Sequence, residues 1–241
     1  MTVPIFIALD FPTADEMWDF LSAFPSDELP AVKVGMELFY AEGPSLVRDL
    51  KAAGFTVFLD LKLYDIPNTV GQAVKNLAKL DIDYLTVHAA GGQRMMEAAV
   101  AGAKEGAATV GVKAPKLLAI TQLTSFSESE MQATQLVSVP LEESVVHLAQ
   151  LAQKSGIDGT ISSAFESNMI HEAVGNEFLS ITPGIRLSGD DQGDQSRVMT
   201  PARAAEMTAD GLVVGRSITQ ASDPVNAYQL VVEGFEEVKN G

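Results

Sequence analysis

The 241-residue chain contains no cysteine, which excludes disulfide bonds, thiolate nucleophiles and zinc–thiolate sites. It also has no apolar run near the roughly 20 residues that span a membrane, and residues 1–10 lack the basic start and long apolar run of a secretory signal. Basic residues are scarce, since the chain has 16 Lys and Arg but 32 Asp and Glu, which gives a formal net charge of -16. This charge repels nucleic acid phosphates and anionic membrane surfaces. We therefore expect a cytoplasmic protein without nucleic acid or membrane partners.

The sequence has no motif for a metal site or a serine hydrolase. Of its three histidines, His147 and His171 fall in predicted helices and His88 ends a predicted strand, so no cluster has metal-ligand spacing. The acidic residues of the loop 187–196 do not match the spacing of an EF-hand. A Ser/His/Asp triad is compatible with the composition, but no G-x-S-x-G motif supports one. We expect no metal site.

Strand and helix patterns alternate eight times without a Pro/Ser-rich linker or a change in composition. This alternation predicts a parallel sheet, and eight such units in a chain of this length favour one (β/α)₈ barrel domain over residues 1–241. An open doubly wound sheet is the alternative. The predicted strands are 5–9, 31–35, 56–63, 84–88, 116–121, 159–162, 178–182 and 211–214, and the clearest helices are 43–53, 66–79, 93–104, 141–154 and one starting near 224.

The third predicted strand carries the most unusual polar residues. Asp60 and Lys62 lie two residues apart, so on a strand they project from one face while Leu59, Leu61 and Leu63 project from the other. Burying a carboxylate and an ammonium group costs desolvation energy that either structure or chemistry must justify. A structural ion pair, with Asp65 capping the next helix, is the simpler reading of such a pair taken alone.

Polar residues also follow several other predicted strands. In a barrel these positions share the carboxyl-terminal face, where barrel enzymes place their active sites. Gly215-Arg216 after the last strand offers a backbone donor and a guanidinium group suited to a phosphate dianion, although an arginine in such a position is more often a solvated surface residue. The strand-end candidates are Asp10, Lys33, Asp60, Lys62, Thr124, Arg186 and Arg216.

The run from Asp60 to Thr69, DLKLYDIPNT, resembles the signature of the orotidine 5'-monophosphate decarboxylase family. It has Leu63-Tyr64 where Phe-His is most frequent, but these positions lie between the charged residues. The resemblance extends over nearly the whole chain through further segments in the family's order. These are Asp10, Lys33, Leu123-Thr124-Ser125, Pro183-Gly184-Ile185-Arg186, Gly193-Asp194-Gln195 and Val213-Val214-Gly215-Arg216.

The resemblance implies a (β/α)₈ barrel that acts as a homodimer with shared active sites. It also implies that no cofactor or metal is used and that orotidine monophosphate is converted to uridine monophosphate in pyrimidine synthesis. By position, Lys62 would donate a proton to C6 of the pyrimidine and Asp60 would lie beside the substrate carboxylate. Asp65 and Thr69 would reach the neighbouring subunit's site. The remaining implied contacts are Asp10 and Lys33 with the ribose, Thr124, Ser125 and Gln195 with the pyrimidine, and Arg186, Gly215 and Arg216 with the phosphate, helped by Gln195.

Two other functions compete with this reading. A sugar-phosphate decarboxylase, aldolase or epimerase on a similar barrel can share a D-x-K-x-x-D pattern, and such enzymes typically use a divalent metal. Ile66-Pro67-Asn68-Thr69 and Thr124-Ser125 disfavour that alternative. A barrel that binds phosphorylated ligands without catalysis is the other, and the complete set Asp60, Lys62 and Asp65 disfavours it.

Overall fold

The computed structural model describes residues 4–187 and 199–240 and has a closed parallel β-barrel at its centre. Its strands are hydrogen-bonded in chain order from β1 to β8, and β8 pairs with β1 to close the barrel. This confirms the predicted (β/α)₈ barrel over the open sheet. The strands are β1 Phe6–Ala8, β2 Ala31–Gly35, β3 Val57–Leu63, β4 Tyr84–His88, β5 Lys116–Ile120, β6 Gly159–Ile161, β7 Leu179–Thr182 and β8 Gly211–Val214.

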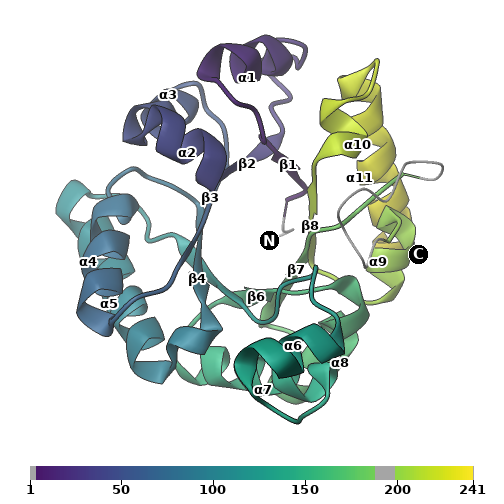
Figure 1. Ribbon diagram of the computed structural model, residues 1–241. Helices are drawn as coiled ribbons and strands as arrows, with labels where there is room; N and C mark the ends of the chain where they lie inside the picture. The colour runs from purple at the N-terminus through teal and green to yellow at the C-terminus, as the bar shows by residue number, and fades with distance from the viewer. Residues whose placement is uncertain (1–3, 188–198, 241) are drawn as a thin grey trace.

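The helices form an outer ring around the strands, as Figure 1 shows. In the described ranges, no helix is both long and apolar enough to cross a membrane. The helices are α1 Ala14–Leu21, α2 Met36–Glu42, α3 Pro44–Ala52, α4 Pro67–Ala78, η1 Ala89–Gly91, α5 Gln93–Val110, α6 Glu128–Gln135, α7 Leu141–Lys154, α8 Ala164–Val174, α9 Pro201–Glu206, α10 Arg216–Thr219 and α11 Pro224–Asn240.

Local sequence signals account for several helix ends. The Thr13 side chain accepts a hydrogen bond from the backbone of Glu16 at the start of α1, and Ser127 and Glu130 form a reciprocal capping box at the start of α6. Helix α5 continues six residues beyond the predicted end at Lys104, because its alanine-rich sequence runs on until Gly111. Gly111 adopts φ 74°, a left-handed conformation that favours glycine and ends the helix.

The apolar core has two parts that alternate along each strand. Residues such as Val57 and Leu59 point outward and pack against the helices, whereas Phe58 points into the barrel. Inside, the rings of Phe6, Phe58 and Tyr84 form an aromatic cluster with centroid distances of 5.1, 5.1 and 6.1 Å. These rings fill the lower barrel, so polar side chains nearer the carboxyl ends of the strands lie above an apolar floor.

Candidate active site

Strand β3 places its two charged residues on the inward face of the barrel. Phe58, Asp60 and Lys62 all line one cavity, while Leu59 and Leu61 pack in the outer core. The prediction that Asp60 and Lys62 share a face is therefore confirmed. Register with β2 pairs Lys33 with Phe58 and Gly35 with Asp60, which brings Lys33 beside the same carboxylate.

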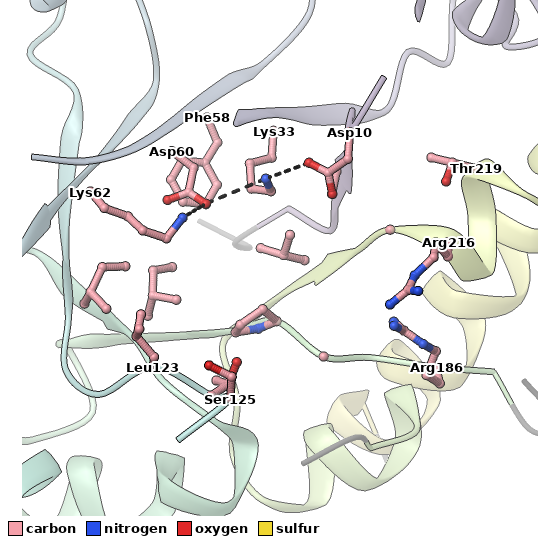
Figure 2. A pocket seen from close by; sticks show the side chains of 18 of the residues that line it. Asp10, Lys33, Phe58, Asp60, Lys62, Leu123, Ser125, Arg186, Arg216 and Thr219 are labelled. Atoms are coloured by element: carbon pink, nitrogen blue, oxygen red, sulfur yellow. Dashed lines mark hydrogen bonds and ion pairs between the residues drawn. The ribbon is translucent and has the colours of Figure 1, made fainter. Parts of the chain in front are cut away.

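Four charged side chains form a continuous chain of alternating sign (Figure 2). The ammonium nitrogen of Lys62 lies 2.7 Å from Oδ2 of Asp60, and that of Lys33 lies 3.6 Å from the same oxygen. Lys33 also lies 3.5 Å from Oδ1 of Asp10. The Asp60 side chain is 13% exposed and that of Lys62 32%, so the cationic end of the chain faces the cavity.

The surroundings of Asp60 keep its carboxyl group ionised. Burial by itself raises the pKa of Asp60, but the positive charges of Lys33 and Lys62 and hydrogen bonds from Lys62 and Thr86 act in the opposite direction. The net result is a pKa below the ordinary value of 3.8. At neutral pH Asp60 is therefore a fixed negative charge between two lysines.

Lys62 has an unusual backbone conformation for a strand residue. Its φ of 50° lies in the left-handed region, and the register between β3 and β4 shifts between Leu59 and Leu63. For a residue other than glycine, this conformation costs roughly 1–2 kcal/mol. Such strain persists only where surrounding contacts fix it, and it concentrates at functional sites.

The cavity has a volume of about 510 Å³ and opens at the carboxyl ends of the strands. It contains most of the predicted site residues: Asp10, Lys33, Asp60, Lys62, Thr124, Ser125, Arg186, Gly215 and Arg216. The residues in this lining that we did not predict include Gln122, Thr219 and Gln220. Gln122 directly follows β5, so its position at a strand end was the available signal. Among residues 4–187 and 199–240, no group of three or more His, Cys, Asp and Glu side chains is placed to hold a metal ion.

The two arginines lie together at the end of the cavity away from Lys62. Figure 2 shows the guanidinium groups of Arg186 and Arg216 pointing toward one another. Arg186 is buried and donates from Nη1 to the carbonyl oxygen of Ile185 at 2.9 Å, which holds its side chain in place. Two planar cations side by side, at the opposite end of the cavity from Lys62, suit a dianionic group such as phosphate.

Three predicted site residues are not among those that line this cavity. Asp65 is exposed and accepts a hydrogen bond from the backbone N–H of Ile66 at 2.6 Å, and Thr69 is exposed on the first turn of α4. Gln195 falls outside the residues that the structure describes. Asp65 and Thr69 are therefore accessible from outside this cavity.

Tyr64, at the position where the family signature most often has histidine, stacks on His88 at the end of β4. Their ring centroids lie 5.5 Å apart with an interplanar angle of 30°. Burial, followed by the nearby charge of Lys62, lowers the pKa of His88. A neutral His88 adds no further positive charge beside Lys62.

Comparison with known proteins identifies the family. Residues 4–231 match the model of the Orotidine 5'-phosphate decarboxylase / HUMPS family. The chain is 58% identical over 236 residues to orotidine 5'-phosphate decarboxylase from Oenococcus oeni, covering 98% of this chain and 100% of that one. It is 55% identical to the enzyme of that name from Latilactobacillus sakei, covering 99% and 100%. The crystal structure of orotidine 5'-phosphate decarboxylase from Lactobacillus acidophilus superimposes with a TM-score of 0.87 at 42% identity, covering 96% of this chain and 98% of that one. The chain therefore belongs to the orotidine 5'-phosphate decarboxylase family.

Proposed function

We propose that the protein converts orotidine 5'-monophosphate to uridine 5'-monophosphate and carbon dioxide, a step of pyrimidine synthesis. Family membership and the names of relatives at 55–58% identity support this activity. The observation within the site that carries it is the charge arrangement of the cavity. A chain of alternating charges ending at Lys62 occupies one end, and Arg186 and Arg216 occupy the other.

Lys62 supplies the charge that this reaction needs. When the bond between C6 and the carboxyl carbon breaks, its electron pair stays on C6, where the ring offers no adjacent electron sink. A fixed cation at that position lowers the barrier because it stabilises the developing carbanion. The Lys62 ammonium group then donates a proton to C6, and solvent returns a proton to the amine before the next turnover.

Asp60 holds Lys62 in this role. Asp60, ionised at neutral pH, fixes the ammonium group at 2.7 Å. The Asp60 carboxylate would also lie beside the substrate carboxylate. Repulsion between the two negative charges would destabilise the bound substrate before carbon dioxide leaves. Lys33, between Asp60 and Asp10, completes the array and, together with Asp10, holds the ribose hydroxyls.

The rest of the cavity orients the nucleotide. Arg186, Arg216 and the backbone of Gly215 bind the phosphate, far from the bond that breaks. Binding energy gained there holds the pyrimidine against Lys62 and raises the rate of the chemical step. Thr124 and Ser125 border the pyrimidine, and the family resemblance assigns Gln195, which lies outside the described residues, to both the pyrimidine and the phosphate.

We propose further that residues 1–241 act as one domain in a cytoplasmic homodimer. Asp65 and Thr69 contribute to the partner's site, which agrees with their exposure outside their own cavity. Large apolar side chains are exposed after the neighbouring strands β2 and β3, and contact with a second subunit would bury them. They are Met36, Tyr40, Tyr64 and Ile66.

A spectrophotometric decarboxylation assay tests this function. Purified protein should decrease the absorbance of orotidine monophosphate at an equal rate with and without a chelator, because no cofactor or metal is required. Loss of turnover on chelation would instead support the sugar-phosphate alternative. Absence of any decrease, with the nucleotide still bound, would support a binding protein without catalysis.

A further inference from the structure

We infer that Thr86 is a positioning residue for the reaction, because its hydroxyl group holds both Lys62 and Asp60 in their working geometry. This inference rests on the proposed function. Thr86 lies on β4, faces the barrel interior and is fully buried. It is not among the residues that line the cavity, so it would act through its two neighbours on β3.

The hydroxyl group makes two hydrogen bonds of good length. Oγ1 of Thr86 accepts from the backbone N–H of Lys62 at 2.8 Å and donates to Oδ1 of Asp60 at 2.9 Å. Asp60 thus uses one carboxylate oxygen for Thr86 and the other for the ammonium groups of Lys62 and Lys33. Thr86 fixes the rotation of the carboxylate on which both lysines depend.

The contact to Lys62 accounts for its strained backbone. The register shift between β3 and β4 lies at this point, and the Lys62 N–H meets the Thr86 side chain. That hydrogen bond satisfies a buried donor in a conformation, φ 50°, that lysine rarely adopts. Removal of the hydroxyl would take away the acceptor that this N–H has in the structure.

A hydroxyl group is needed because the two bonds have opposite direction. Threonine and serine can accept from an N–H and donate to a carboxylate at the same time. Valine has nearly the same shape as threonine but makes neither bond, so it would leave a backbone donor and a carboxylate oxygen unsatisfied. A comparison of Thr86→Val with Thr86→Ser therefore isolates the hydroxyl group from the packing.

Steady-state kinetics on the purified full-length enzyme test the inference. Thr86→Val should lower kcat by about 10- to 100-fold, the equivalent of one hydrogen bond to a charged group. KM and the affinity for uridine monophosphate should stay within about twofold, since the phosphate and ribose contacts remain, and Thr86→Ser should restore most of kcat. Thr160→Val is the matched control. Thr160 is a buried threonine on β6, and its hydroxyl makes only a 3.5 Å contact with a carbonyl oxygen.

A merely structural role gives a different result. It would lower Tm and the yield of folded protein but leave the kcat of the folded fraction unchanged, and that outcome would overturn the inference. Equal kcat for Thr86→Val and Thr160→Val would also overturn it. Should Thr86→Val fail to fold, Thr86→Cys replaces it, because a thiol is only a weak donor and a weak acceptor.

Crystal structures of the variants supply a readout that does not depend on the substrate. In Thr86→Val, we expect the Lys62–Asp60 contact of 2.7 Å to lengthen or the Lys62 backbone to leave the left-handed region. Both features unchanged would overturn the inference even if the proposed function is correct. Wild-type protein without turnover on orotidine monophosphate would instead count against the proposed function, while these structures would still decide the role of Thr86.

Discussion

The ammonium group of Lys62 lies 2.7 Å from the carboxylate of Asp60, two residues earlier on the same inward face of β3. The strand repeat of two residues places both side chains on this face, and Thr86 on β4 hydrogen-bonds both residues. The neighbouring strands add Lys33 from β2, so that one carboxylate serves two cations.

Replacement of Lys62 by alanine should reduce turnover by about a thousandfold or more, because it removes both the cation and the proton donor. Loss of absorbance of orotidine monophosphate measures the rate, and far-ultraviolet circular dichroism checks the fold. Lys75→Ala is the control, since Lys75 pairs with Glu105 at 3.0 Å between α4 and α5. A near-normal rate for Lys62→Ala would exclude the proposed proton donor.

Replacement of Arg216 by alanine should weaken binding of uridine monophosphate by about 10- to 100-fold, the effect of losing a charged hydrogen bond to phosphate. Affinity for uridine, which has no phosphate, should change little. Isothermal titration calorimetry with the two ligands separates these effects. Arg203→Ala, at an exposed pair with Glu206 on α9, is the matched arginine control. An equal loss of affinity for both ligands would contradict the assignment.

Gly35→Ala should lower kcat about tenfold without unfolding the barrel. A Cβ atom at Gly35 would lie 3.3 Å from the Lys33 nitrogen and 3.4 Å from Oδ1 of Asp10, so the Lys33 amine would have to move by a few tenths of an ångström. The backbone of Gly35, at φ -88°, accepts alanine without strain. Gly234→Ala in α11 is the control, because its nearest neighbour would be Pro201 at 3.7 Å. Equal rates for the two variants would show that Lys33 tolerates displacement.

The free energy of unfolding should depend on pH through Asp60. Because its folded-state pKa is lowered, its contribution is fully present above the ordinary value of 3.8 and is lost as pH falls through the lower folded-state value. The difference in free energy of unfolding between wild type and Asp60→Asn should therefore be constant between about pH 5 and pH 7, where the pH is above the ordinary value of 3.8. It should change only in more acidic solution. Urea denaturation at a series of pH values measures it. A difference that stays constant down to pH values well below 3.8 would contradict the assignment.

Mixing two inactive variants should restore activity if the sites are shared. A dimer of one Lys62→Ala and one Asp65→Ala subunit keeps one site with both residues intact, so an equal mixture should recover about a quarter of wild-type activity after subunit exchange. Gel filtration confirms the dimer. Activity that stays at the level of the separate variants would show that Asp65 serves its own subunit.

Much of the barrel follows from local sequence patterns. The bounds of β2, β4, β8 and α7 agree with prediction, because each is a short apolar run or an amphipathic segment between clear turn residues. Helix α2 was not predicted, since it begins immediately after Gly35, where nothing in the sequence separates it from the strand. A period of two predicted that Asp60 and Lys62 share one face of β3, and the closed barrel determines that this face points inward.

The finer geometry of the site depends on contacts between strands. The left-handed conformation of Lys62 arises where β3 and β4 change register, which no pattern within β3 encodes. In the sequence, Thr86 looks like an ordinary residue of a buried strand. Only the pairing of β4 with β3 brings its hydroxyl to two polar partners, Lys62 and Asp60. The meeting of Arg186 with Arg216 likewise requires the barrel to bring the ends of β7 and β8 together.

The positive φ of Lys62 has a consequence for engineered or diverged forms of this barrel. Glycine adopts that conformation freely, so Lys62→Gly would relieve local strain while abolishing the amine. The same change would remove the 2.7 Å ion pair with Asp60, so relief of strain and loss of the pair would oppose one another in the free energy of unfolding. At this residue the chain keeps a strained backbone conformation because turnover requires the amine.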